Sequence, residues 1–336
     1  MEKRQLGKTG LEVTSVGFGG IPIQRVDQDQ VIKIVAEMER VGINFIDTAR
    51  GYTVSEGFLG NALKGKRDKF ILATKSMAKD YEAMKEEVET SLKNLQTDYI
   101  ELYQLHLVKD MDDYNHVMGP NGAYRALVEA KEAGKIGHIG ITAHSVDLMM
   151  ALVDDMPFET IQFPYNLVER QAEELFEKAG KRGIGIICMK PIAGGAITNG
   201  TLSIKYILQN KNVSAVIPGM EKVDEVYQNA QVANGNYVFT EKEKTEADKI
   251  VEELHGNFCR RCGYCLPCTQ GINIPSMFIA EGYLTRYKMT EYATKYYAKQ
   301  AVKAGACIEC GECMSKCPYH LPIIEKMKQV KEVFGE

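Results

Sequence analysis

The chain has 336 residues, of which 45% are hydrophobic and 26% are charged, and its formal net charge at pH 7 is −4. This length allows one large domain and a small one, and the slightly acidic balance argues against a nucleic-acid partner. The first ten residues contain no apolar signal-peptide core, and no uncharged apolar run approaches the roughly 20 residues that span a bilayer. We therefore expect a cytoplasmic protein that does not enter membranes.

From about residue 14 to residue 232, short apolar runs alternate with longer amphipathic ones. The runs typical of strands are residues 13–20, 43–49, 69–75, 98–106, 136–142, 160–166, 183–191 and 213–219. Strands that alternate with helices predict right-handed crossovers and a parallel sheet, and eight such units in about 220 residues favour a (β/α)₈ TIM barrel. A doubly wound open sheet is the alternative. It would need a Gly-rich turn that opens a helix after the first strand, whereas GFGGIPIQ continues into a loop with proline.

The helical segments between these runs have apolar residues on one face. Residues 29–42 and 81–95 show this periodicity, and Gly134 and Gly183 stand where a helix should end. A further helix is expected at about 240–255, and residues 283–305 have the pattern of one helix. We therefore predict a barrel domain over residues 1–240, followed by a linker helix and a small, mainly helical domain over residues 241–336.

Polar side chains follow three consecutive strands of the predicted barrel. Asp47 and Tyr52 come after the second strand, Lys75 after the third and His106 after the fourth. Because catalytic groups of such barrels lie at the C-terminal ends of the strands, we expect these four side chains to converge. A tyrosine is too weak an acid at neutral pH unless its anion is stabilised, which a neighbouring lysine held by an aspartate would do. The set therefore predicts proton delivery to a substrate that His106 orients.

Five segments resemble the aldo-keto reductases over residues 3–232. In chain order they are RQLGKTGLEVTSVGFGG, FIDTARGYTVSEGFLG, ILATKS, DYIELYQLH and IQFPYNLVER. The resemblance implies that Tyr52 is the general acid, that Lys75 lowers its pKa and is paired with Asp47, and that His106 positions the substrate carbonyl. A nicotinamide cofactor would supply the hydride. A Schiff-base role for Lys75, as in an aldolase, is the alternative; it requires a neutral amine, whereas Asp47 would keep Lys75 charged.

The same resemblance implies nucleotide contacts at the later strand ends, where a loop and a helix N-terminus would offer backbone N–H groups to a phosphate. The matching positions are Gly19, Gly20, Thr142, Gln162, Met189, Lys190, Pro191, Ile192, Gly219, Met220 and Asn229. Three positions depart from the commoner family pattern. The fifth strand ends in Thr142-Ala143 rather than Ser-Asn, Met189 replaces a stacking aromatic residue, and Glu225 stands where an arginine often meets the 2′-phosphate of NADP. A carboxylate there repels that phosphate, so NADH suits the site at least as well as NADPH.

Eight of the nine cysteines form two groups near the C-terminal end. They are Cys259, Cys262, Cys265 and Cys268, and then Cys307, Cys310, Cys313 and Cys317. The second group, with Pro318 after it, has the spacing of bacterial-type [4Fe–4S] ferredoxin motifs, and the first group has one residue fewer before its last cysteine. Structural zinc is the alternative, but it more often takes two CxxC knuckles separated by a longer loop. The pattern therefore favours a ferredoxin-like domain with two [4Fe–4S] clusters.

In two-cluster ferredoxins, the fourth cysteine of each group ligates the other cluster. Applied here, this rule joins Cys317 to the first three cysteines of the first group and Cys268 to the first three of the second group. The ninth cysteine, Cys188, lies in an apolar strand run and is interpreted as a small buried hydrophobic residue.

A barrel of this kind followed by two such motifs is similar to the ferredoxin-fused branch of the aldo-keto reductases found in prokaryotes. The resemblance implies an oxidoreductase that acts on a carbonyl/alcohol pair with hydride from NADH or NADPH. Hydride transfer moves two electrons together, whereas each cluster passes one; a flavin could link them, and it is left open although no flavin motif is evident. The alternative is an electron-transfer or redox-sensing subunit, with the barrel as a scaffold or as a reductase fed by a ferredoxin or another electron carrier.

Overall fold

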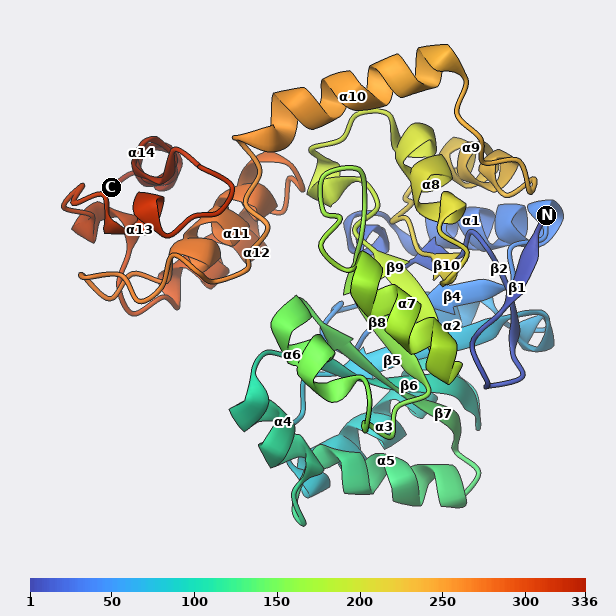
Figure 1. Cartoon of the computed structure of the whole chain (residues 1–336). Helices are drawn as coiled ribbons and strands as arrows, with labels where there is room; N and C mark the ends of the chain where they lie inside the picture. The colour runs from blue at the N-terminus through green and yellow to red at the C-terminus, as the bar shows by residue number, and fades with distance from the viewer. The chain divides into compact units, whose positions relative to one another are not determined.

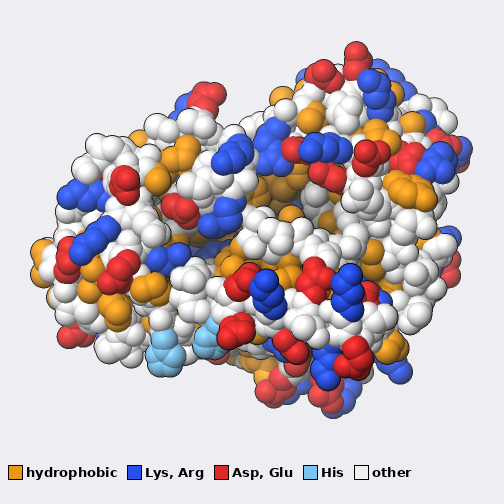
Figure 2. Space-filling model, turned by 90° about the horizontal axis from the view of Figure 1, so that it is seen from above, with side chains coloured by type: hydrophobic (Ala, Val, Ile, Leu, Met, Phe, Trp, Pro, Cys, Tyr) orange, Lys and Arg blue, Asp and Glu red, His pale blue; other side chains and the backbone are white.

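The computed structural model describes all 336 residues. Its contacts divide the chain into two compact units: residues 1–191 with 199–240, and residues 192–198 with 241–336. The segment 192–198, which was expected in the barrel domain, thus groups with the second unit. None of the helices is both long and apolar enough to cross a membrane. Acidic and basic side chains are interspersed over the face shown in Figure 2, in keeping with the small net charge.

The first unit is built around eight parallel strands that pair in chain order (Figure 1). They are β3 (Phe18–Gly19), β4 (Phe45–Asp47), β5 (Ile71–Ser76), β6 (Ile100–Val108), β7 (Ile136–Ala143), β8 (Thr160–Pro164), β9 (Gly185–Met189) and β10 (Val213–Val216). Parallel bridges between Val16 and Val216 and between Gly19 and Gly219 join the first strand to the last, so the sheet closes. The predicted (β/α)₈ barrel is confirmed, and the doubly wound open sheet is excluded.

Closure of the barrel depends on glycine at position 19. The Gly19 amide donates to Pro218 O at 2.9 Å, which brings the two backbones together. A Cβ atom at this position would lie 2.7 Å from Ile217 O, inside any normal contact distance. A larger residue at Gly19 would therefore separate β3 from β10. The predicted nucleotide contact at Gly19 thus has a structural reason to be glycine that involves no ligand.

A two-stranded hairpin precedes the barrel. Strand β1 (Lys3–Gln5) pairs antiparallel with β2 (Glu12–Thr14). Residues 13–20, expected as a single strand, are divided between β2 and β3, because Thr14 pairs with β1 whereas Ser15 O accepts the amide of Val216 from β10. Leu6, which follows β1, is fully buried in the interior core of the barrel.

Helices cover the outside of the barrel. They are α1 (Gln28–Val41), α2 (Ser55–Ala62), α3 (Tyr81–Leu95), α4 (Met111–Met118), α5 (Ala123–Glu132), α6 (Val146–Leu152), α7 (Glu173–Arg182), α8 (Gly200–Gln209) and α9 (Val223–Val232). The predicted ends at Gly134 and Gly183 are confirmed by their left-handed backbone, with φ of 71° and 72°. Helix α1 begins where the Asp27 carboxylate accepts the Gln30 amide, and it ends at the left-handed Gly42.

Side chains alternate between the interior of the barrel and the helical layer. The interior core contains Phe45 of β4, Ala73 of β5 and Leu102 of β6, while their neighbours Ile46 and Leu72 belong to the core under the helices. Two residues further along β4 and β5, the same alternation turns Asp47 and Lys75 inward, and four residues further along β6 it does the same for His106. This register directs the predicted catalytic residues into the mouth of the barrel.

The second unit is helical. Its helices are α10 (Glu241–His255), α11 (Ile274–Thr285), α12 (Thr290–Ala298), α13 (Glu312–Ser315) and α14 (Ile323–Phe334). The prediction of one helix over residues 283–305 was wrong, because the chain breaks between α11 and α12, where Lys288 has a left-handed φ of 56°. Tyr292 and Tyr296 do share a face of α12, with ring centroids 6.4 Å apart. Apolar residues of α11 and α14 form a core together with Cys265 and Cys317.

Candidate active site and cysteine cavities

The inward face of three neighbouring strands carries the polar centre of the barrel. Asp47 is the last residue of β4, Lys75 lies near the end of β5, and His106 lies near the end of β6. Lys75 is directly opposite Gln104 in the β5–β6 register. The strand order therefore places these side chains next to one another, as the positions of the strand ends predicted.

Lys75 and Asp47 form a buried ion pair. Lys75 Nζ lies 2.5 Å from Asp47 Oδ1 and donates to Thr48 O at 2.8 Å, and the exposed fraction of both side chains is 2%. Gln104 Nε2 donates to the second carboxylate oxygen of Asp47 at 3.2 Å. Burial lowers the pKa of Lys75, and the negative charge of Asp47 opposes that shift. The pair thus fixes the ammonium group in a site that water does not reach.

Tyr52 lies on the loop between β4 and α2, beside this ammonium group. Lys75 Nζ is 5.0 Å from the centroid of the Tyr52 ring. The Tyr52 and His106 rings meet edge to face, with centroids 6.1 Å apart and an interplanar angle of 88°. The structure therefore brings all four predicted residues into one cluster. Its composition, a phenol ring next to a fixed cation and an imidazole, is suited to proton transfer.

His106 is held as a neutral imidazole. Burial lowers its pKa to about 3, and the positive charges of Lys75 and Lys190 act in the same direction. Its Nδ1 atom is buried without a hydrogen-bond partner in the protein. Burying a polar atom without a hydrogen bond is unfavourable in free energy. A ligand that forms a hydrogen bond with this nitrogen would remove that penalty. A neutral ring has one N–H donor and one acceptor nitrogen, and can orient a carbonyl oxygen without carrying charge.

The depressed pKa of His106 predicts a pH dependence of stability. The unfolded state, with a pKa near 6.5, binds more protons than the folded state between pH 6.5 and pH 3, so stability falls as the pH drops through that window. Between pH 7 and pH 5 the loss is about 2 kcal/mol from this residue alone. Urea unfolding of the wild type and of His106→Asn at both pH values measures it. An equal loss of stability in both proteins would contradict the prediction.

Several predicted nucleotide positions have partners within the barrel. Thr142 Oγ1 accepts the amide of Leu107 at 2.7 Å, and so supports the left-handed backbone directly after His106. Lys190 Nζ lies 2.8 Å from His144 Nε2, and Lys190 itself has a φ of 58°. Gln162 is 1% exposed, and its Oε1 atom has no hydrogen-bond partner. Gln162 therefore has an acceptor available for an amide group of a ligand.

The remaining nucleotide positions fall into different surroundings. Gly20 and Gly219 are sites of close packing, where a Cβ would lie 2.9 Å from Ser55 Oγ and 2.6 Å from Pro22 respectively. Met220 is fully buried and Asn229 of α9 is half-buried. Met189 is half-buried and ends β9, and the carbonyl oxygen of Pro191 accepts the Ser203 hydroxyl. Ile192 groups with the second unit.

The start of α9 differs from the expected phosphate site. The Glu225 carboxylate accepts the amide of Glu221 at 2.8 Å and that of Lys222 at 3.2 Å. These two N–H groups are therefore engaged within the chain, and the expected phosphate contact of the loop and helix N-terminus stays a prediction. Arg25 forms an ion pair with the Glu221 carboxylate at 2.7 Å, so this cation is also engaged.

Three polar residues near the active site were not identified from the sequence. Gln104 binds Asp47, and Arg50 and Glu56 belong to a buried network under α2 and α3. The alternation in YQLH offered a signal for Gln104, because it places Gln104 and His106 on the same face of the strand. Arg50 and Glu56 gave no comparable pattern.

The eight clustered cysteines line two separate cavities of the second unit. One cavity is lined by Cys259, Cys262, Cys265 and Cys317, and the other by Cys268, Cys307, Cys310 and Cys313. Each cavity thus combines three cysteines of one motif with the fourth of the other. Burial raises the pKa of the Cys265 thiol to about 12, so a bound cationic centre is needed to hold it as a thiolate. Four thiols around one space fit a [4Fe–4S] cluster.

Cys188 lies apart from both cavities, in β9. It is fully buried, and burial raises its pKa well above the usual value. This confirms the prediction of a small buried hydrophobic residue, because a protonated thiol in an apolar core is unreactive.

The barrel, the residues at its mouth and the cysteine cavities define the class of the protein. Residues 15–203 match the model of the aldo/keto reductase family, and residues 258–322 match a 4Fe-4S dicluster domain. The chain belongs to the aldo/keto reductase family and carries an iron–sulfur domain at its C-terminal end. It is an oxidoreductase of the aldo-keto reductase type.

Among named relatives, L-galactose dehydrogenase of Arabidopsis thaliana is 29% identical over 280 residues, which cover 68% of this chain and 87% of that protein. The NADH-specific methylglyoxal reductase of Escherichia coli is 28% identical over 263 residues, covering 66% of this chain and 79% of that protein. Of solved structures, the holo form of the aldo-keto reductase AKR11C1 from Bacillus halodurans is similar with a TM-score of 0.64 and 28% identity. The match covers 74% of this chain and 96% of that one.

Proposed function

We propose that the barrel reduces a small carbonyl compound, or oxidises the matching alcohol, with Tyr52 as the proton donor and a nicotinamide nucleotide as the hydride source. The observation that carries this proposal is the Lys75 ammonium group, fixed by Asp47 at 2.5 Å and 5.0 Å from the centroid of the Tyr52 ring. A barrel that served only as a scaffold would have no use for a buried cation beside a phenol, because burying a charge is costly.

In the proposed reaction, the Tyr52 hydroxyl donates its proton to the carbonyl oxygen of the substrate. The Lys75 ammonium stabilises the phenolate that remains, and Asp47 keeps the ammonium charged and in place. Neutral His106 donates a hydrogen bond to the same carbonyl oxygen and so orients it towards Tyr52. In the alcohol-to-carbonyl direction the same groups act in reverse, and the tyrosinate accepts the proton.

The residues at the mouth fit a nicotinamide. When bound, the reduced nucleotide would supply the hydride. Gln162 Oε1, buried without a partner, is suited to accept the N–H of the carboxamide. Thr142 lies near the end of β7 and Lys190 directly follows β9, and these two strands flank the Gln162 strand β8. The ammonium group of Lys190, beside His144, offers a positive charge to the phosphates.

The preference between NADH and NADPH is expected to depend on the Glu225 carboxylate at the start of α9. We expect NADH to bind about tenfold more tightly than NADPH, because the Glu225 carboxylate holds the amides of Glu221 and Lys222 and repels a 2′-phosphate. Glu225→Gln should narrow the difference by removing the charge. Fluorescence titration of both nucleotides with both proteins measures the two dissociation constants. Tighter binding of NADPH to the wild type would contradict this prediction.

We propose that the second unit holds two [4Fe–4S] clusters with crossed ligation. Cys259, Cys262, Cys265 and Cys317 would bind one cluster, and Cys307, Cys310, Cys313 and Cys268 the other. The support is the sharing of the cysteines between two cavities, together with the match to a 4Fe-4S dicluster domain. Such clusters pass one electron at a time, so exchange with a ferredoxin or a similar carrier is the chemistry that they add.

A second candidate function has one observation in its favour. Because Glu225 occupies amides at the start of α9, the barrel could act without nicotinamide, as a reductase that receives electrons from a ferredoxin through the clusters.

An anaerobic titration of the reconstituted protein with NADH and then NADPH separates the candidates, with nucleotide and cluster absorbance followed together. Binding without cluster bleaching supports the hydride-transferring reductase. Bleaching indicates that electrons pass to the clusters and directs the search to a flavin. Absence of binding favours the ferredoxin-fed reductase.

A further inference from the structure

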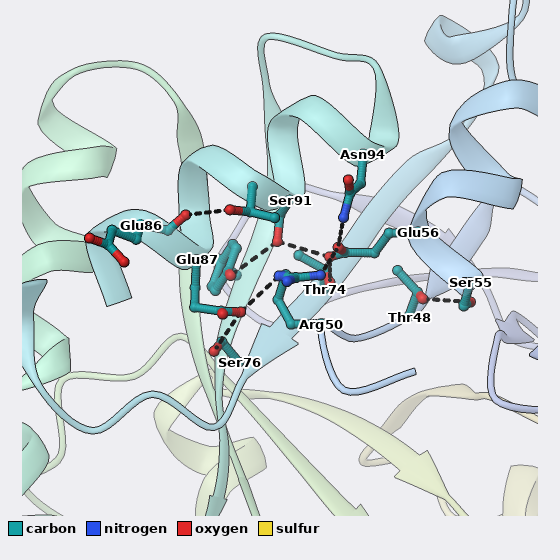
Figure 3. Close-up of polar contacts among 12 residues, drawn as sticks. Thr48, Arg50, Ser55, Glu56, Thr74, Ser76, Glu86, Glu87, Ser91 and Asn94 are labelled. Carbon is teal, nitrogen blue, oxygen red and sulfur yellow. Dashed lines mark hydrogen bonds and ion pairs between the residues drawn. The ribbon is translucent and has the colours of Figure 1, made fainter. Parts of the chain in front are cut away.

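A buried polar network lies behind the active site, between β5 and the helices α2 and α3 (Figure 3). At its centre is the Glu56 carboxylate, which is 1% exposed. Thr74 and Ser91 donate their hydroxyl protons to Glu56 Oε1, each at 2.8 Å. Asn94 Nδ2 donates to Glu56 Oε2 at 3.2 Å. A carboxylate that accepts this many hydrogen bonds is held in one position.

Arg50 connects this network to the loop that carries Tyr52. Its guanidinium donates to Glu56 Oε2 at 3.1 Å and forms a second ion pair with Glu87 at 2.7 Å. Ser76 Oγ donates to the same Glu87 oxygen at 3.3 Å. Thr74 and Ser76 flank Lys75 on β5, with their side chains on the outer face of the barrel. The two carboxylates that bind Arg50 therefore bind the two neighbours of Lys75 as well.

The Tyr52 loop has little apolar packing of its own. Gly51, Thr53 and Val54 are exposed, and Thr53 has a φ of 43°. The backbone of the loop is held instead by polar contacts: the Arg50 amide donates to Lys75 O at 2.9 Å, and the Thr48 and Ser55 hydroxyls lie 2.8 Å apart. An exposed loop with few apolar contacts opens at low cost unless such contacts hold it. Arg50 is the one charged side chain on the loop.

We propose that Arg50 and Glu56 are positioning residues: the salt-bridge network of Arg50 with Glu56 and Glu87 holds the Tyr52 hydroxyl in register with the Lys75 ammonium. The role rests on the proposed carbonyl reduction, and neither residue is placed in contact with the substrate. The network also affects the protonation of Lys75. Burial lowers the pKa of Lys75, and the negative charges of Asp47 and Glu56 both oppose that shift. Displacing a reacting group by about 1 Å lowers rates by about 100-fold.

The test uses the full, cluster-loaded chain with Arg50→Ala. We expect kcat of carbonyl reduction to fall about 10- to 100-fold, while KM stays within about threefold, because a misplaced proton donor affects the transition state and not substrate binding. Added methylguanidinium should restore much of the activity, since the Arg50 side chain is 21% exposed and its place can be reached from solvent. A variant that is merely misfolded gains nothing from methylguanidinium. Glu56→Gln should lose kcat similarly without being rescued.

The matched control is Arg40→Ala on α1, which removes an exposed ion pair with Glu37. It should leave kcat unchanged. Hydrogen exchange gives a readout that does not depend on turnover. In Arg50→Ala, the amides of Arg50, Tyr52 and Ser55 should exchange faster, whereas those of β7 should not. If the wild type reduces no carbonyl compound, the proposed function fails, and exchange still decides the positioning role. Unchanged kcat in an active enzyme, or unchanged loop exchange in Arg50→Ala, would overturn the inference.

Discussion

Replacing Tyr52 by phenylalanine is expected to lower kcat for carbonyl reduction by about 10²- to 10⁴-fold, the usual contribution of a positioned general acid. The substitution removes only the hydroxyl. The ring keeps its edge-to-face contact with His106 and its position over Lys75. The measurement is the steady-state rate of NADH or NADPH oxidation with a panel of small aldehydes and ketones.

Two controls keep this result specific. Tyr52→Phe should bind nucleotide with the affinity of the wild type and carry the same iron content, because the hydroxyl contacts neither site in the proposed arrangement. Tyr227→Phe on the outer surface of α9, where the side chain is 47% exposed, should retain full activity. Undiminished turnover by Tyr52→Phe would exclude Tyr52 as the proton donor.

Paired cysteine substitutions should reveal the ligation of the two clusters. Cys268 and Cys307 line one cavity although they belong to different motifs, and Cys259 and Cys317 line the other. The double variant Cys268→Ala/Cys307→Ala should therefore lose one cluster and retain about four of about eight iron atoms per chain. Cys259→Ala/Cys268→Ala, which removes two ligands of a single motif, should lose both clusters. Iron analysis and electron paramagnetic resonance of the dithionite-reduced proteins measure the outcome.

The opposite ranking would refute crossed ligation. If each motif held its own cluster, Cys259→Ala/Cys268→Ala would retain one cluster and Cys268→Ala/Cys307→Ala would retain none. Cys188→Ala serves as the control, because this buried thiol lies outside both cavities and its loss should leave the iron content unchanged.

The barrel fold and the identity of its four central residues could be predicted from the sequence. Each strand has a contiguous apolar run, and in a parallel barrel all strands end on the same side, so Asp47, Lys75 and His106 could be expected to meet. The roles of Arg50 and Glu56 could not. Their partners come from β5, which carries Thr74, and from α3, which carries Glu87 and Ser91, and only the packing of α2 and α3 on β5 brings them together.

Local exceptions were also beyond sequence reasoning. The break between α11 and α12 falls in a stretch without glycine or proline, where Lys288 takes a left-handed conformation that its residue type disfavours. At α9, the position of Glu225 in the chain suggested repulsion of a phosphate. Whether its carboxylate would turn to the amides of Glu221 and Lys222 depends on the side-chain conformation, which the sequence does not determine.

The assignment of residues 192–198 to the second unit bears on how such proteins can be cut and recombined. This segment belongs to the loop after β9, yet Arg286 Nε of the second unit donates to Gly194 O at 3.3 Å, and a Cβ at Gly194 would lie 2.8 Å from the Tyr287 hydroxyl. The iron–sulfur unit therefore consists of two segments of the chain, and no single cut in the sequence separates it from the barrel. A chain truncated after residue 240 keeps a loop without its partners, and a chain that starts at residue 241 lacks part of its own fold. Grafting this unit onto another barrel requires transplanting the loop as well.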